Sequence, residues 1–239
     1  MNIRLFIPCF VDQLYPQTAF NMIKVLEKTG CSVSYNTRQT CCGQPAFNAG
    51  FRNEAKSVCT KFISDFEGSE YIVTPSASCA GFVRNYYSHL FDNSSLHNAV
   101  KELSSRIYEF SEFMVKVLQI TQVGAEFSGK AVYHDSCSAL RECKIKNEPR
   151  KLLAHVKGLE LVEMNEAETC CGFGGTFAIK FEAISVSMAE QKVENALATG
   201  AGYLISTDLS CLMHMQGYIN KKGHRLETLH IADVLASGW

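Results

Sequence analysis

The stretch TCCGQPAF at residues 40–47 places two cysteines side by side and follows them with a glycine, and TCCGFGGT repeats this motif at residues 169–176. Adjacent cysteines occur in strained vicinal disulfides, in redox dithiols, and in metal or cluster sites. The two copies lie about 129 residues apart. A single doublet could be coincidence, but two copies indicate that the surrounding sequence repeats as well.

Three further pairs of segments recur at a similar separation, and the last pair lies closer together, 121 residues apart. They are IRLFIPCF with KAVYHDSC, YIVTPSASC with YLISTDLSC, and YEFSEFMVKVL with LHIADVLASG, the last aligning Glu112 with Asp233. A repeat of this length indicates a duplicated domain, because solenoid units span only roughly 20 to 50 residues. We therefore expect a first Cys-Cys-Gly repeat in residues 1–125 and a second in residues 126–239.

Apolar runs of strand length alternate with apolar residues at helical spacing in both halves. Strands are predicted at residues 3–7, 31–35, 71–74, 131–134, 159–163 and 203–206, and helices around 19–26, 55–66, 152–156 and 182–199. Strands separated by helical crossovers form mainly parallel sheets covered by helices. The expected fold class is therefore α/β, with two pseudo-symmetric repeats whose mainly parallel sheets are flanked by helices.

Eleven cysteines are the one unusual feature of the composition of this 239-residue chain. In the absence of an export signal, clustered cysteines indicate metal, iron–sulfur or redox chemistry more often than disulfides. Four of them directly follow predicted strands, at the carboxyl edge where open α/β sheets bind ligands, and each doublet follows a strand by a longer loop. We expect all eight repeated cysteines at this edge: Cys9, Cys41, Cys42, Cys79, Cys137, Cys170, Cys171 and Cys211.

Four thiolates from three loops in each half suit an iron–sulfur cluster, which cysteines hold in sets of four. Gly43, Gly172 and Gly174 would allow the backbone to approach the cluster closely. His134, just before Cys137, is a candidate to donate a hydrogen bond or proton to the cluster, or to replace a thiolate. The alternative for His134 is a histidine at the end of a strand that bonds to a neighbouring group.

Zinc is the main chemical alternative, although the C-x2-4-C pairs that usually form a four-cysteine zinc site are absent. A thioredoxin-like dithiol would need Cys-x-x-Cys, which is also absent. Cys31, Cys59 and Cys143 have no counterpart in the other half, and we interpret them as small apolar core residues.

The overall charge and hydropathy point to an ordinary globular protein. With a formal net charge of −1 and no block of basic residues, the chain is not expected to bind nucleic acid. No apolar run approaches the roughly 20 residues of a membrane-spanning helix, and the first residues lack the apolar core of a signal peptide. We expect a cytoplasmic protein without a membrane span.

The duplicated Cys-Cys-Gly motif, with a single cysteine upstream and another downstream, resembles the cysteine-rich (CCG) domain family. That family includes the cysteine-rich subunit of heterodisulfide reductase and the iron–sulfur subunit of glycolate oxidase. The resemblance covers nearly the whole chain. Four strings are similar to the short, two-repeat members that serve lactate utilisation: IPCFVDQLYP, TCCGQPAFNAG, CCGFGGTFAIK and TDLSCLMH.

This resemblance implies an iron–sulfur electron-transfer subunit of a cytosolic complex that oxidises L-lactate to pyruvate. The subunit would not be a complete enzyme alone, and its partners would be a ferredoxin-type iron–sulfur protein and a third subunit. The eight repeated cysteines match the family's cluster ligands. Ser76 and Asp208 stand where the fullest family pattern has a further cysteine. The resemblance thus favours one or two ordinary [4Fe–4S] clusters over a five-cysteine cluster. The alternative is a scaffold subunit that holds zinc or no metal.

Overall fold

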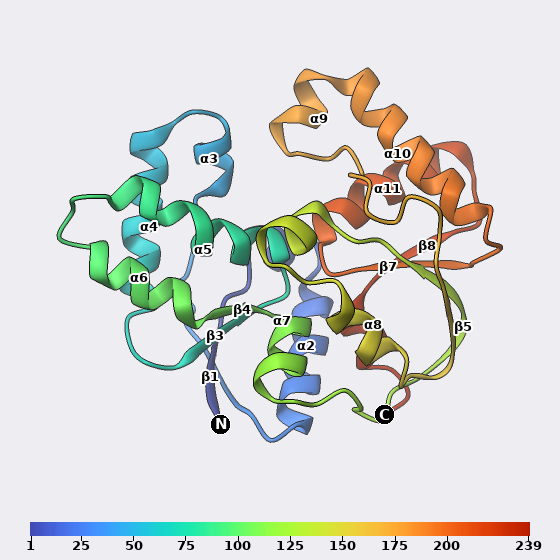
Figure 1. The fold of residues 1–239 in the computed structure, drawn as a ribbon, viewed down its shortest axis with the longest axis horizontal. Coiled ribbons are helices and arrows are strands. Elements are labelled where there is room, and N and C mark those ends of the chain that lie inside the picture. Colours follow the sequence, from blue (N-terminus) through green and yellow to red (C-terminus); the bar gives the residue numbers. More distant parts are fainter.

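The computed structural model describes residues 1–239, which form two sheets of four parallel strands (Figure 1). The strand orders, β2-β1-β3-β4 and β6-β5-β7-β8, are identical when the second half is laid on the first. The strands are β1 Asn2–Leu5, β2 Ser32–Tyr35, β3 Tyr71–Thr74, β4 Ile107–Glu109, β5 Glu126–Tyr133, β6 Lys157–Val162, β7 Tyr203–Ser206 and β8 Glu227–His230. The predicted α/β class with parallel sheets flanked by helices is confirmed.

Helices follow every strand. They are α1 Cys9–Leu14, α2 Pro16–Lys28, α3 Gln44–Asn48, α4 Arg52–Asp65, α5 Ala77–Phe91, α6 His97–Arg106, α7 Phe110–Glu112, α8 Asn147–Leu153, α9 Thr176–Lys180, α10 Glu182–Leu197, α11 Leu209–Lys222 and α12 Ile231–Leu235, with π-helical turns η1 Phe113–Val117 and η2 Ser138–Glu142. The first half has α6 between α5 and β4, whereas α11 leads to β8 without a further helix. This extra helix accounts for the smaller separation of the last pair of repeated segments.

The strands with a continuous apolar run were predicted best. β3 and β7 match the predicted residues 71–74 and 203–206 because three of their four residues are buried in the middle of a sheet. β5 begins at Glu126, five residues before the predicted start, because its first half is only partly buried and alternates polar and apolar residues. β4 and β8 were not predicted, since they are short and each carries polar side chains.

The two halves share one hydrophobic core. Its largest cluster includes Leu5 and Phe110 from the first half as well as Val132 and Leu204 from the second. Helix α2 packs against α12 of the other half, and α8 packs against α7, so each half covers the other with an equivalent pair of helices. The predicted boundary between residues 125 and 126 lies in the connection between η1 and β5 and stays a prediction.

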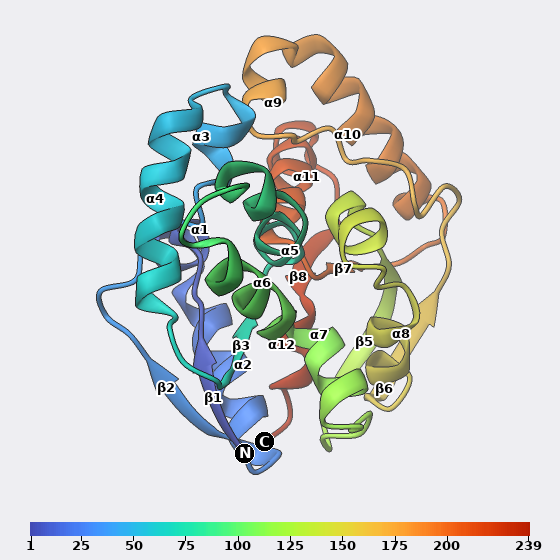
Figure 2. The ribbon, with the colours of Figure 1, turned by 60° about the vertical axis from the view of Figure 1, so that its left-hand side comes forward.

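The seam between the halves is also polar in places. Thr18 Oγ1 and Asn21 Nδ2 on α2 donate hydrogen bonds to the two carboxylate oxygens of Asp233 on α12, at 3.0 and 2.9 Å. Both termini lie at the end of the molecule opposite to α3 and α9 (Figure 2). None of the helices combines the length and apolar character that crossing a membrane requires.

Candidate metal centre

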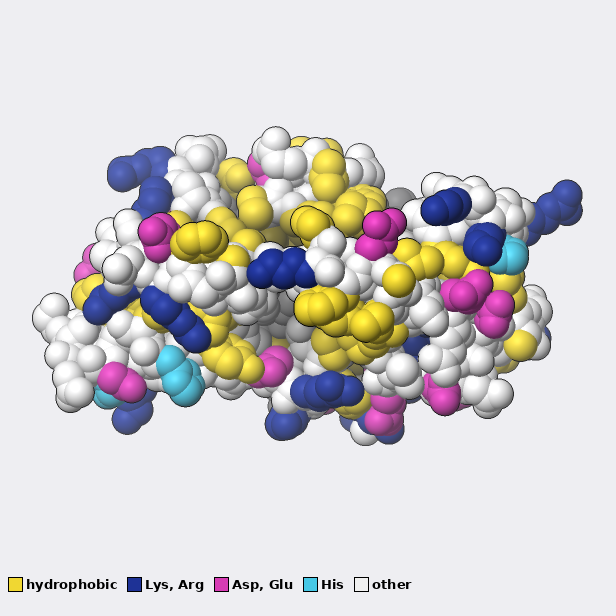
Figure 3. All heavy atoms as spheres, turned by 90° about the horizontal axis from the view of Figure 1, so that it is seen from above, with side chains coloured by type: hydrophobic (Ala, Val, Ile, Leu, Met, Phe, Trp, Pro, Cys, Tyr) yellow, Lys and Arg dark blue, Asp and Glu magenta, His cyan; other side chains and the backbone are white.

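A cavity of about 420 Å³ lies between the two halves, bordered by α3 on one side and the start of α9 on the other. Seen from above, hydrophobic side chains surround a central hollow on this face (Figure 3). All eight repeated cysteines line the cavity: Cys9, Cys41, Cys42, Cys79, Cys137, Cys170, Cys171 and Cys211. The eight cysteines therefore lie together, as expected. Cys9, Cys41, Cys42 and Cys79 form the first half-site, and Cys137, Cys170, Cys171 and Cys211 form the second half-site.

Short strand–helix connections place the single cysteines. Only two residues separate β3 from α5 and β7 from α11, so Cys79 and Cys211 are each the third residue of their helix. They were expected in loops, and the structure corrects this: the helices begin immediately after the strands. Cys9 is the first residue of α1, and Cys137 directly precedes η2.

Each doublet is folded around its glycine. Gly43 and Gly172 adopt φ angles of 92° and 90°, and the backbone N–H of each donates to the sulfur two residues earlier, at 3.4 Å. A Cβ at Gly172 would lie 2.6 Å from the carbonyl oxygen of Ser185, and one at Gly43 would lie 2.9 Å from Cys59 Sγ. Only glycine therefore fits at either position.

Only one of the three glycines that were expected to face a cluster lies at the cavity. Gly43 and Gly172 are buried beneath the doublets and do not line the cavity, whereas Gly174 does. Their role is to turn the chain and to donate to sulfur, and Gly174 alone of the three offers its backbone to the cavity.

Hydrogen bonds among the thiols favour one thiolate in each half-site. Donation from Cys42 and Cys9, together with the Gly43 N–H, lowers the pKa of Cys41 well below its usual range. Donation from Cys137 and Cys171 lowers the pKa of Cys170 in the same way. None of the eleven cysteines forms a disulfide.

The wall behind the first half-site is apolar. Phe6 is fully buried and meets the rings of Phe62 and Phe66 at 4.7 and 5.7 Å between centroids. The backbone carbonyl of Cys42 accepts a hydrogen bond of 2.7 Å from the buried hydroxyl of Tyr87. The Sγ atoms of Cys42 and Cys79 lie 3.5 Å apart.

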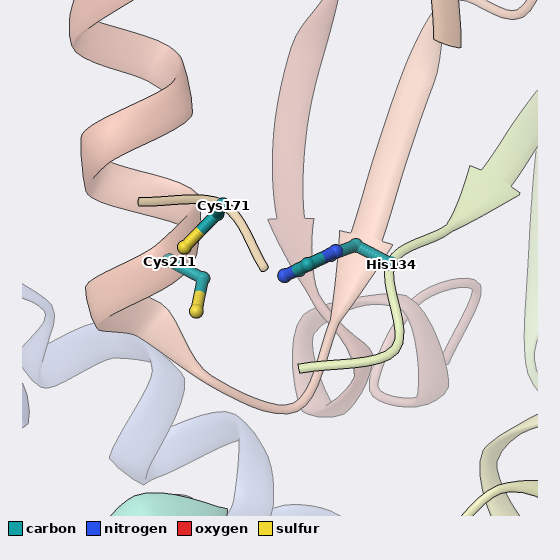
Figure 4. A group of neighbouring side chains, drawn as sticks. All are labelled: His134, Cys171 and Cys211. Atoms are coloured by element: carbon teal, nitrogen blue, oxygen red, sulfur yellow. The ribbon is translucent and has the colours of Figure 1, made fainter. Parts of the chain in front are cut away.

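The wall behind the second half-site is polar. His134 is completely buried, and neither of its ring nitrogens has a hydrogen-bond partner. Its ligand nitrogen and the sulfurs of Cys171 and Cys211 all lie within 4.8 Å of one another (Figure 4). Burial, and the nearby ammonium of Lys192, lower the pKa of His134 to about 3, so its imidazole is neutral at physiological pH.

A buried carboxylate joins the half-sites. Asp208, at the start of α11, accepts hydrogen bonds from the backbone N–H and the hydroxyl of Ser78 on α5, at 2.9 and 3.2 Å. Burial raises the pKa of Asp208 to about 6. Ser76, at the equivalent position of the first half, caps α5 by accepting from the N–H of Cys79 at 3.4 Å. The two residues that replace a cysteine of the fullest family pattern thus cap a helix and tie the halves together.

Sequence reasoning missed two of these residues. Asp208 was recognised only as a missing cysteine, and its contact with Ser78 depends on the packing of the halves. Lys192 was overlooked, although it lies on the buried face of α10 with Ala189 and Val193. A lysine within an apolar stripe of a predicted helix indicates a buried charge that needs a partner, and it could have been recognised in the sequence. Its ammonium donates to the carbonyl oxygens of Glu166 and Ala167.

The remaining cysteines lie outside the cavity. Cys31, Cys59 and Cys143 are buried, as interpreted from their apolar surroundings in the sequence. Cys59 Sγ donates to the carbonyl oxygen of Cys42 at 3.5 Å, and Cys143 Sγ donates to that of Ala77 at 3.4 Å.

The donors fit a metal group bound mainly by sulfur. Each half-site offers four thiols from three segments, one of them already favoured as a thiolate, and metal ligation requires deprotonated cysteine. The second half-site adds a buried histidine whose nitrogens have no partner within the protein. Buried polar groups are normally hydrogen-bonded, and an exception needs an explanation.

A family model described as "Cysteine-rich domain" matches residues 3–84 and again residues 131–216. The chain is 41% identical over its full length to "Lactate utilization protein A 2" of Bacillus cereus (strain 03BB102), of which it covers 99%. It is 43% identical to "Lactate utilization protein A" of Anoxybacillus flavithermus, over 98% of this chain and 99% of that protein.

One solved structure shares the fold at low sequence identity. It is the crystal structure of a hypothetical protein from Helicobacter pylori, with a TM-score of 0.60 and 12% identity. The match covers 98% of this chain and 48% of that one, so this chain spans about half of its length. At this identity the likeness concerns the fold alone.

Proposed function

This chain belongs to the cysteine-rich domain family, and from that premise we propose that it is the iron–sulfur, electron-transferring subunit of a cytoplasmic lactate-utilisation system. The observation that carries the proposal is that all eight repeated cysteines, supplied by both halves, line one cavity. The function in the names of the full-length relatives supports the assignment to lactate. In this system the subunit receives or passes on electrons that are released when L-lactate is oxidised to pyruvate.

We assign one [4Fe–4S] cluster to each half-site, with the four cysteines of that half as ligands. The cluster type follows from the number of thiols, since such clusters are held by four cysteines. The backbone N–H groups that donate to the doublet sulfurs stabilise negative charge there. Hydrogen bonds to cluster and thiolate sulfur also tune the reduction potential of a cluster. Gly43 and Gly172 supply two of these N–H groups.

The partners are a ferredoxin-type iron–sulfur protein and a third subunit. A docking surface for one of them borders the cavity at the turn from α9 to α10, where apolar side chains face solvent. Ile179 is 84% exposed, and Phe181 and Ile184 are more than half exposed. Exposed apolar side chains that cluster in this way mark interaction sites. Gly174 and Thr176, in the same segment, line the cavity.

Zinc is the second candidate, and one distance favours it. Two thiolates bound to one tetrahedral zinc ion with Zn–S bonds of roughly 2.3 Å lie about 3.8 Å apart. The 3.5 Å between Cys42 Sγ and Cys79 Sγ is close to this value. A zinc-loaded chain would serve as a scaffold of the same system and would not transfer electrons.

Anaerobic reconstitution with iron and sulfide separates the two candidates. We expect a brown protein with about four irons for each half-site, an absorption band that bleaches on reduction, and an electron paramagnetic resonance signal of the reduced clusters. Cys42→Ser and Cys171→Ser should each remove about half of the iron. Cys31→Ser, which changes a buried cysteine outside the cavity, is the matched control and should keep all of it.

A colourless protein with stoichiometric zinc, under conditions in which other cluster proteins reconstitute, would overturn the iron–sulfur proposal. Equal iron loss in Cys31→Ser and Cys171→Ser would show that the loss reflects misfolding and not a missing ligand.

A further inference from the structure

Phe6 and His134 occupy the same place in the two halves. The backbone N–H of Phe6 donates to the carbonyl of Val73 on β3 at 3.0 Å, and that of His134 donates to the carbonyl of Ile205 on β7 at 2.8 Å. Each residue stands three positions before the first cysteine of its half-site and is fully buried. The fold therefore supplies an internal control, since the same position holds a ring without polar atoms in one half and an imidazole in the other.

Phe6 packs as a core residue, whereas the ring nitrogens of His134 have no hydrogen-bond partner in the protein. Phe6 makes edge-to-face contacts with two further phenylalanines. His134 has two ring nitrogens, both buried and both without a hydrogen-bond partner. Burying a polar group without a hydrogen-bond partner destabilises the folded protein. A histidine that only filled space would carry this cost without any compensating contact.

The imidazole faces sulfur. In Figure 4, His134 extends from the end of β5 toward Cys171, on the loop, and Cys211, on α11. The three ligand atoms lie within 4.8 Å of one another, and all three side chains are buried. Neutral imidazole nitrogen and thiolate sulfur are joint ligands of zinc and, in Rieske centres, of iron.

We propose that His134 is a metal ligand, so that the second half-site binds its metal through an imidazole nitrogen together with the thiolates of Cys171 and Cys211. The imidazole then replaces one of the two other thiolates of that half-site, which otherwise would supply four. The first half-site is then all-thiolate, because Phe6 offers no donor at the equivalent position. This inference rests on the proposed function only in requiring a metal in the second half-site. It does not depend on whether that metal is iron or zinc.

The test is the nitrogen coupling of the metal. The full chain is labelled with ¹⁵N-histidine, reconstituted anaerobically with iron and sulfide, reduced, and examined by pulsed electron paramagnetic resonance. We expect the coupling of a directly bonded histidine nitrogen. It should disappear in His134→Phe, which copies the first half. It should persist in His214→Phe, the matched control, because His214 bonds to Ser185 at 3.1 Å and its equivalent in the first half is Phe82.

If the protein binds zinc and no cluster, the same labelled chain is loaded with Co²⁺, which is paramagnetic, and the coupling is measured again. Failure of the proposed function and failure of this inference are therefore distinguishable. Absence of a directly bonded nitrogen coupling in the metal-loaded wild type, or its persistence in His134→Phe, overturns the inference and leaves the eight cysteines as ligands. A chain that binds neither metal overturns both proposals. Even if His134→Phe does not fold, the absence of the coupling in the metal-loaded wild type overturns the inference.

Discussion

The two half-sites lie on sheets with the same strand order and contain the same four cysteines, but their surroundings differ. Behind the first lie aromatic rings, with Phe6 and Phe82 at positions where the second has His134 and His214. Near the second lies the ammonium of Lys192, at the position of Ile63 in the first. The duplication preserved the four cysteines and the turns that present them, while the residues around them diverged. Surroundings of this kind set the reduction potential of a bound cluster, so the half-sites are built to differ.

The largest expected effect comes from the ion pair that supports only the second half-site. Arg150 donates to both carboxylate oxygens of Asp135 at 2.8 Å, and Asp135 is almost completely buried. Arg150→Met leaves this carboxylate unpaired and should lower the free energy of unfolding by about 3–5 kcal/mol. Urea unfolding followed by circular dichroism measures the change.

The equivalent of Asp135 in the first half is Ile7, whose N–H donates to the Gln39 side chain at 2.8 Å. Gln39→Ala should therefore cost only about 1–2 kcal/mol. Lys157→Met, which removes an exposed pair with Glu126, is the control and should leave the free energy of unfolding nearly unchanged, because water screens exposed ion pairs. If Arg150→Met and Lys157→Met destabilised the protein equally, the two half-sites would not differ in how they are supported.

A second difference lies at the ends of the last strands, where Glu109 of β4 and His230 of β8 are equivalent. Burial raises the pKa of Glu109 to about 7, so the folded protein holds this proton more tightly than the unfolded chain does. The resulting stability is fully present below pH 4.5 and is lost as the pH rises through 7. Burial lowers the pKa of His230, so its contribution is instead lost as the pH falls below about 6.5.

Glu109→Gln keeps the acceptor for the Glu112 N–H and removes the titration. From pH 4.5 to 7.5 the variant should therefore lose about 3 kcal/mol less unfolding free energy than the wild type. His230→Gln should change the pH dependence of the unfolding free energy in the opposite direction. Urea unfolding at three pH values measures each slope. Parallel curves for Glu109→Gln and the wild type would contradict this assignment.

The smallest expected effect concerns the potential of the second half-site. Lys192 places a positive charge near the Cys170 and Cys171 thiols, and a cation stabilises the reduced, more negative cluster. Lys192→Met should lower that potential by on the order of 50 mV, which corresponds to about 1 kcal/mol for one electron. A redox titration followed by electron paramagnetic resonance measures it. Ile63→Met, at the equivalent position, should shift neither potential, and a positive shift in Lys192→Met would refute the electrostatic argument.

Much of the architecture followed from local patterns. The repeat predicted two equivalent halves, and the apolar runs at residues 71–74 and 203–206 located the central strands because a strand buried on both faces is continuously apolar. Short strands with polar residues, β4 and β8, gave no such signal. The cysteines that follow strands were correctly placed at the carboxyl edge, but the start of α5 before Cys79 and of α11 before Cys211 was not foreseen. A helix that begins two residues after a strand leaves no loop composition to recognise.

The sequence by itself determined the repeat, the fold class and the eight thiols, because these depend on order and spacing along the chain. Only the tertiary structure decided that both sets of thiols border a single cavity, since this depends on how the halves pack across α2 with α12 and α8 with α7. It also decided that Asp208 reaches Ser78 and that His134 faces sulfur without a partner. Contacts between residues far apart in the sequence are set by the packing of the whole chain, which no local pattern encodes.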